Sequence, residues 1–224
     1  MAEYKISINQ LASFSTSSEY KKRAIVKQQK TPPKVLVARY GLAKARIRKA
    51  IANYGNIQPI LEGIEELKSR TPEKPFDINN KIVSIEAMER FIKMKLPVFL
   101  QDNVYEVLKK PKINSFHVSD VEIIVSADLI IKVFIDGQPF LGGVKIHISK
   151  GDPFDTHRSK YVTTCLYQYL DLIFESSGEI VLPELCLSVD VFADSITSAP
   201  KKLEKVLEDI EMICLEIKKI WPLV

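Results

Sequence analysis

Apolar residues recur at helical spacing through about the first eighty residues of the chain. Helices are predicted from the capping serines Ser15–Ser18 to Gln29, from Val35 to Tyr54 and from Ile60 to Ser69. Breaks separate them at Thr31-Pro32-Pro33, Gly55 and Thr71-Pro72, and Pro72–Asn80 is predicted to be a linker. The start of the chain therefore reads as a small helical region.

The spacing becomes strand-like in the second half of the chain. A helix near residues 84–94 is followed by β-branched runs at residues 121–125, 129–135 and 144–148, then by a helix, a strand and a helix at residues 161–173, 185–192 and 203–221. The order α, β, β, β, α, β, α predicts an α/β (α+β) fold in which helices flank a mixed central sheet. We expect a helical basic region at residues 1–80 and an α/β core at residues 81–224.

Composition favours a soluble globular protein. Hydrophobic residues make up 46% and charged residues 27% of the 224 residues. No run of about 18 apolar residues exists, so no membrane association is expected. Residues 1–10 lack the pattern of a secretory signal. Cys165, Cys186 and Cys214 are widely spaced and form no CxxC pair, which predicts reduced, buried thiols in the cytoplasm.

The charge is unevenly distributed. Between Lys21 and Ala50 there are 11 basic residues and no acidic one, which leaves 21 of the 32 basic residues against all 28 acidic residues elsewhere, a balance of −7. Such a segment is typical of a protein that binds a polyanion, although a solvated basic helix face has the same composition. The candidate nucleic-acid contacts are Lys27, Arg39, Lys44, Arg46, Arg48 and Lys49.

The dipeptide Asp136-Gly137 predicts a tight hairpin turn that sets the register of two strands. In that register Asp128 lies opposite Lys145, with Cβ atoms about 4.5 to 5.5 Å apart. Gly143, Lys145 and His147 then share one face of the sheet. The pair can be a cross-strand ion pair, or a phosphodiester site in which Asp128 holds a divalent cation and Lys145 stabilises charge on the phosphate.

The order of the elements and three short motifs carry a resemblance to a known family. Ser126-Ala127-Asp128 supplies an acid at the start of a core strand, Gly143-Val144-Lys145 a lysine on the next, and Tyr167-Gln168-Tyr169 a Gln and Tyr on the following helix. In these features the region from Ser84 to Trp221 resembles the PD-(D/E)XK nuclease superfamily. The resemblance implies a restriction-endonuclease-like core, Mg²⁺ or Mn²⁺, catalytic Asp128 and Lys145, and cleavage of DNA.

One departure from the family pattern bears directly on activity. Gly143 stands where the family has its second metal-binding acid. By analogy with members in which that acid has moved to the first core helix, Glu89 is the preferred replacement and Glu86 the second. Glu122 and Asp120 on the preceding strand are further candidates.

Two accessory positions and several functions remain open. His147 is a candidate phosphate contact or proton carrier, and Gln168 a second accessory residue. The principal hypothesis is a metal-dependent nuclease that cuts DNA. The alternative is a catalytically inactive nuclease-fold module that binds nucleic acid, DNA rather than RNA, or another protein. A homodimer, or an inhibitory partner protein that needs no nucleic acid, is also compatible with the sequence.

Overall fold

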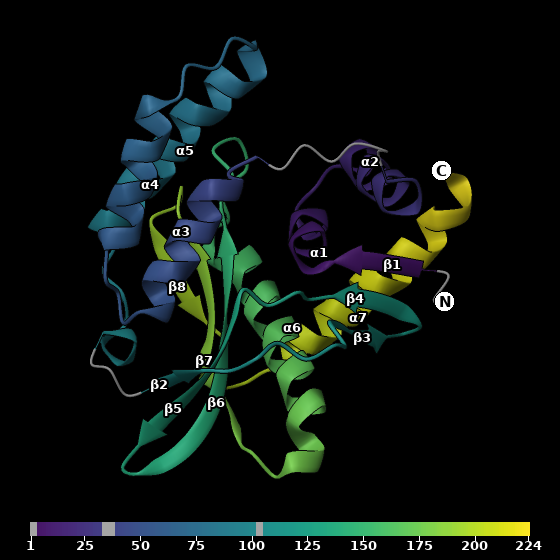
Figure 1. Ribbon diagram of the computed structural model, residues 1–224. Helices are drawn as coiled ribbons and strands as arrows, with labels where there is room; N and C mark the ends of the chain where they lie inside the picture. The colour runs from purple at the N-terminus through teal and green to yellow at the C-terminus, as the bar shows by residue number, and fades with distance from the viewer. Residues whose placement is uncertain (1–3, 33–38, 102–104) are drawn as a thin grey trace.

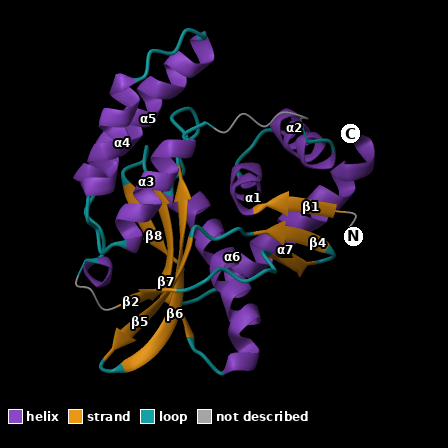
Figure 2. Ribbon diagram, in the orientation of Figure 1, coloured by secondary structure: helices purple, strands orange, loops and turns teal. Residues whose placement is uncertain are grey.

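The computed structural model describes residues 4–32, 39–101 and 105–224 (Figure 1). Its α-helices are α1 (Ile8–Ser15), α2 (Glu19–Lys30), α3 (Gly41–Ala52), α4 (Gln58–Ser69), α5 (Pro75–Lys93), α6 (Thr156–Phe174) and α7 (Glu204–Ile220). Its strands are β1 (Tyr4–Ser7), β2 (Tyr105–Val107), β3 (Ser115–Val118), β4 (Val121–Ile124), β5 (Leu129–Ile135), β6 (Gln138–His147), β7 (Val181–Asp190) and β8 (Ser195–Ser198). The fold is mixed α/β, with mixed sheets flanked by helices, as predicted (Figure 2).

The central sheet has five strands in the order β2-β5-β6-β7-β8. Strands β6 and β7 run parallel, joined by α6, and the other neighbours are antiparallel. The β5–β6 hairpin turns at Asp136 and Gly137, whose φ angles of 50° and 78° suit a two-residue turn. Ile130 pairs with Gly143 in the ladder. The predicted turn and register are therefore confirmed.

A separate three-stranded sheet has the order β1-β4-β3. The sequence predicted that residues 121–125 would form the first of three consecutive core strands, but β4 pairs with β1 and β3 instead. Between β4 and β5 the chain changes direction at Ser126, whose φ is 45°. The four-residue β1 was missed because its partner β4 lies more than a hundred residues further along the chain.

Apolar side chains cover both faces of the central sheet. One face carries Val144 and Ile146 of β6 and packs against α3, α4 and α5. The other face packs against α6, and this core continues through α1, α2, α7 and the three-stranded sheet. In Figure 2 the helices accordingly stand on both sides of the orange central strands. Successive side chains of a strand point to opposite faces of the sheet, so residues 143 and 145 of β6 face the α6 side.

The predicted linker at Pro72–Asn80 is wrong. Helix α5 begins at Pro75, because proline lacks only an N–H that the first helical turn leaves unpaired, and Asp77 stabilises that turn. Residue 80 therefore lies inside α5 and not in a linker. The N-terminal region also divides, since α2 packs in the core of α6 and α7 whereas α3 packs with α4 and α5.

Most other elements agree with the prediction. Helix α2 begins after Ser18, whose side chain accepts a hydrogen bond from the backbone of Lys21, and α4 ends at Ser69 as expected. The predicted start of the second helix at Val35 lies outside the described residues, which show α3 from Gly41. The three cysteines are buried and unbridged. Along the described residues, none of the helices combines the length and apolarity needed to cross a bilayer.

Candidate functional site

Asp128 and Lys145 lie beside each other where β5 begins against β6. The regular β5–β6 ladder ends at the Leu129–Val144 pair, and the backbone N–H of Asp128 donates to the Val144 carbonyl at 2.9 Å, one residue off that register. Both residues are only 7% exposed. Their charged groups nevertheless do not pair directly among the described contacts. The Asp128 Oδ2 accepts the N–H of Ile146 at 2.7 Å, and the Lys145 Nζ donates to the carbonyls of Val125 and Ser126 at 2.9 Å each.

Burial dominates the titration of Lys145. It lowers the pKa of the ammonium to about 8, against an ordinary 10.5, because the charged form loses its hydration. The negative charge of Asp128 opposes this shift, and the positive charges of Lys44 and Lys110 add to it. The folded state therefore holds the Lys145 proton less tightly than the unfolded chain does.

This shift predicts a pH-dependent stability. Between pH 8 and 10.5 the unfolded chain binds more protons at Lys145, so the contribution of Lys145 to the unfolding free energy should rise with pH by about 1.4 kcal/mol per unit. Below pH 8 the contribution is constant. The measurement is urea unfolding of the wild type and Lys145→Met across this range. The difference between the two proteins should follow that slope, and a flat difference would refute the assignment.

Further cations lie near Asp128 and Lys145. The Lys44 Nζ on α3 lies 3.0 Å from the Asp128 Oδ1. Partial burial lowers the pKa of Lys110, an effect that Asp128 opposes and that the positive charges of Arg48 and Lys44 reinforce. We call Lys44, Arg48, Lys110 and Lys145 the cation cluster. The Asp128 carboxylate acts on three of these cations, and Arg48 acts on Lys110, so positive charge is in excess here and the site favours an additional anion.

Gly143 does not leave the space that a second acid needs. A Cβ atom added there would lie 3.0 Å from the Leu170 Cδ1, 3.3 Å from the Leu129 carbonyl oxygen and 3.3 Å from the Leu166 Cδ1. Leucines of α6 thus fill the position in which the family pattern has a metal ligand. The α6 side of the sheet is closely packed at Gly143, which leaves no room there for an ion or for a carboxylate that would bind one.

The proposed replacement acids are engaged elsewhere. Glu86 pairs with Lys150 at 2.6 Å and with Arg90 at 3.2 Å, and these hydrogen bonds lower its pKa. Glu89 is exposed on α5, and its charge acts on Lys68 of α4. Of the two, Glu86 is the less exposed, which reverses the preference drawn from the helix pattern.

The other two acids also lie apart from Asp128. Glu122 accepts a hydrogen bond from Ser115, and Asp120 pairs with Lys218. Within residues 4–32, 39–101 and 105–224, no three His, Cys, Asp or Glu side chains gather as metal ligands would. Since the oxygens of Asp128 already accept from Ile146 and Lys44, the donor set here does not fit Mg²⁺ or Mn²⁺, which prefer several oxygen ligands.

The predicted nucleic-acid contacts occupy different surroundings. Arg46 is held by Glu62 at 3.6 Å and Glu66 at 2.8 Å, so its charge is neutralised within the α3–α4 pair. Arg48 and Lys49 are exposed on α3. The Arg39 guanidinium lies 5.3 Å from the Phe76 ring centre, a cation–π contact. Of this set, Lys44 is the residue that pairs with Asp128, and the charge of Arg48 acts on Lys110.

Lys27 lies apart from the other predicted contacts. It is exposed on α2, and α2 and α3 stand on different sides of the molecule in Figure 1. The basic segment at residues 21–50 is therefore not one continuous surface. Lys110, by contrast, was not singled out, although the run Lys109-Lys110-Pro111-Lys112 gave a local signal of positive charge.

His147 and Gln168 differ in their surroundings. The His147 Nδ1 lies 2.7 Å from the Asp190 Oδ2, and its ring stacks on Phe154 with 3.6 Å between centroids. Asp190 is fully buried and was missed, because a lone acid at a strand end carries no sequence signal. Gln168 is half-buried on α6 and makes no hydrogen bond with Asp128 or Lys145 in the described contacts.

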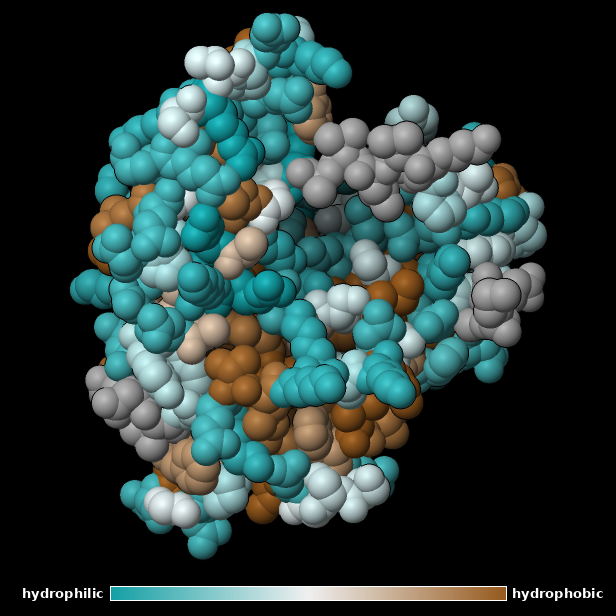
Figure 3. All heavy atoms as spheres, in the orientation of Figure 1, coloured by the Kyte–Doolittle hydropathy of each residue, from teal (hydrophilic) through white to brown (hydrophobic). Residues whose placement is uncertain are grey.

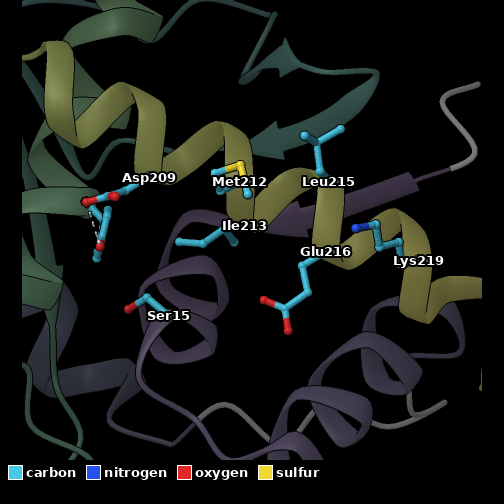
Figure 4. Close-up of a pocket in the computed structure, with 8 residues that line it drawn as sticks. Ser15, Asp209, Met212, Ile213, Leu215, Glu216 and Lys219 are labelled. Atoms are coloured by element: carbon cyan, nitrogen blue, oxygen red, sulfur yellow. Dashed lines mark hydrogen bonds between the residues drawn. The ribbon is translucent and has the colours of Figure 1, made fainter.

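A groove between α1 and α7 is formed by other residues. Figure 4 shows Met212, Ile213, Leu215, Glu216 and Lys219 along α7, with Glu216 directed toward the side on which Ser15 of α1 lies. Met212 is 64% exposed. None of the candidate residues drawn from the sequence lines this groove, so it has no part in the site at Asp128.

Comparison with known proteins does not assign the chain to a family. No protein-family model matches the sequence, and no curated protein matches it.

Proposed function

We propose that this protein binds DNA through its phosphate backbone at the cation cluster. The observation that carries the proposal is the excess of four cations, Lys44, Arg48, Lys110 and Lys145, over one carboxylate at a single place in the fold. Ammonium and guanidinium groups bind phosphate oxygens strongly and release counterions from the DNA when they do so. Asp128 then serves to hold Lys44 in position.

Two members of the cluster supply the contacts and one supports them. Arg48 is exposed and the side chain of Lys44 is 37% exposed, so both can reach a phosphate. They are four residues apart on α3 and therefore share a helix face about 6 Å apart along the axis. Lys145 is tied to two carbonyls and contributes through its field. Contacts of this kind carry no base information, so we expect little sequence preference.

Binding without metal-dependent cleavage fits the local contacts better than the nuclease hypothesis does. Hydrolysis of a phosphodiester by the implied mechanism needs carboxylates that are available to a divalent cation. Asp128 is bonded to Ile146 and Lys44, and Leu166 and Leu170 occupy the space beside Gly143. The protein is therefore proposed as the nucleic-acid-binding alternative of the sequence analysis, with DNA as the partner.

The test is the salt dependence of DNA affinity in the double variant Lys44→Gln/Arg48→Gln. Fluorescence anisotropy with a labelled duplex between about 50 and 200 mM salt gives the slope of log affinity against log salt. Loss of two phosphate contacts should reduce that slope by about 2. The matched control is Lys202→Gln/Lys205→Gln, which removes the same charge from exposed positions beside and within α7.

Two results would contradict the proposal. One is an unchanged slope in Lys44→Gln/Arg48→Gln, or an equal reduction in the control variant. The other is DNA cleavage by the wild type in Mg²⁺ or Mn²⁺ that is lost in Lys145→Met while the variant stays folded, since that outcome favours the nuclease hypothesis.

A further inference from the structure

A large polar pocket, apart from the cation cluster, lies between two groups of helices, α1 and α2 on one side and α3 and α5 on the other. Its volume is about 780 Å³, within the range of small-molecule sites. The pocket is lined by the loop that follows β6, by α1, α2 and α5, and by the turn before α3. In Figure 3 the surface is hollowed between the two groups of helices. The pocket stands at the carboxyl ends of β6 and β7, the parallel pair of the central sheet, where α/β proteins commonly bind ligands.

Tyr40 joins two walls of this pocket. It is buried and adopts a φ of 58°, a conformation that a bulky residue rarely takes. Its backbone N–H donates to the Asn80 Oδ1 at 3.0 Å, and its hydroxyl accepts the Lys150 N–H at 3.3 Å. The pocket walls from α5 and from the loop after β6 are therefore fixed to each other through one residue.

The polar side chains of the pocket are of two kinds. Three are amides, Gln10, Gln28 and Asn79, from three different helices, and their side-chain amides form no hydrogen bond within the described part of the chain. Two are cations, Arg39 and Lys150, and Lys150 also pairs with Glu86 at 2.6 Å. An amide presents a donor and an acceptor side by side, the pattern that reads the edge of a nucleobase. Cations bind phosphate.

We infer that this pocket binds a nucleotide, with its phosphate near Arg39 and Lys150 and its base edge at the amides. The same chemistry is offered by a free nucleoside monophosphate and by the phosphorylated end of a DNA strand. Tyr40 connects the pocket to the DNA site, because its carbonyl accepts the N–H of Lys44, the first member of the cation cluster along α3. The inference goes beyond backbone binding, and it does not require that proposal to hold.

The test uses isothermal titration calorimetry with dAMP, dGMP, dCMP and dTMP on the full chain. At least one of them should bind saturably. The double variant Gln28→Ala/Asn79→Ala should lower the affinity for that nucleotide by about tenfold or more, as loss of about 1.4 kcal/mol of binding free energy implies. Gln138→Ala, an exposed amide in the β5–β6 hairpin, is the control and should bind like the wild type. In the second arm of the experiment, a single-stranded oligonucleotide with or without a terminal phosphate is tested as a competitor of that nucleotide.

The outcomes separate the sources and the two proposals. If the phosphorylated oligonucleotide competes with the nucleotide and the unphosphorylated one does not, the natural ligand is a strand end. If neither oligonucleotide competes, the ligand is a free nucleotide. Lys44→Gln/Arg48→Gln should still bind the mononucleotide, so failure of DNA binding leaves this inference intact. It is overturned if none of the four nucleotides binds, or if the amide double variant binds as tightly as the wild type.

Discussion

Gly143→Glu is expected to destabilise the protein by about 4 kcal/mol or more and to create no metal site. The added Cβ would already press on Leu170 and on the Leu129 carbonyl, and the carboxylate would then be forced among apolar groups. Overpacking costs about 1 to 3 kcal/mol, and an uncompensated buried charge costs about 3 to 5 kcal/mol. Domain stabilities are about 5 to 15 kcal/mol, so this variant lies near unfolding.

Urea unfolding of Gly143→Glu, Gly143→Ala and Gly151→Glu measures these costs separately. Gly143→Ala should lose about 1 kcal/mol, because leucine side chains can shift by a few tenths of an ångström. Gly151→Glu makes the same chemical change where nothing lies within 4 Å of the new Cβ, and it should change the unfolding free energy by less than about 0.5 kcal/mol. A stable Gly143→Glu protein that cleaves DNA in Mg²⁺ would contradict both expectations.

Asp190→Ala is expected to lose about 4 kcal/mol of unfolding free energy. The carboxylate is fully buried and accepts the N–H groups of Phe192 at 3.0 Å, Ala193 at 2.7 Å and Phe154 at 2.7 Å, besides its contact with His147. Truncation leaves these donors without a partner inside the protein. Each buried unsatisfied donor costs about 1 to 3 kcal/mol, partly recovered by local rearrangement or by water.

A conservative change at the same position separates charge from geometry. In Asp190→Asn the amide oxygen can still accept from Phe192 and Ala193, but its NH₂ group confronts the N–H of Phe154, so we expect an intermediate loss of about 2 kcal/mol. Asp194→Asn is the control, because Asp194 is exposed and asparagine tolerates its φ of 51°. Unfolding curves in urea give the three values. Similar stability of the wild type and Asp190→Ala would show that the network is not structural.

The carboxylate of Asp190 joins segments that the DNA and nucleotide proposals both use. It ties the end of β7 to His147 at the end of β6 and to Phe154 in the loop before α6. That loop begins at Ile148 and includes Lys150 of the nucleotide pocket. Loss of Asp190 should therefore weaken nucleotide binding as well as stability, whereas Asp128 pairs with Lys44 of the cation cluster.

The local order of the chain was largely readable from its sequence. Hairpin register followed from Asp136-Gly137, because a two-residue turn with positive φ values fixes which residues face each other. That register predicts Asp128 beside Lys145, and the two residues lie side by side in the fold. Helices α2, α4, α6 and α7 followed from apolar spacing and from caps such as Ser18. These features depend on neighbours a few residues apart, which one sequence displays directly.

Only the tertiary structure decided what surrounds those residues. The sequence gives the alternation of Gly143 and Lys145 on one face, but whether that face meets solvent or the leucines of α6 depends on helix packing. It gives the basic run at residues 21–50, but not its division between α2 and α3, nor the neutralisation of Arg46 by Glu62 and Glu66. Pairing of β1 with β4 and of His147 with Asp190 joins distant segments. Such contacts are selected by the burial of the whole chain, because no local pattern encodes the partner.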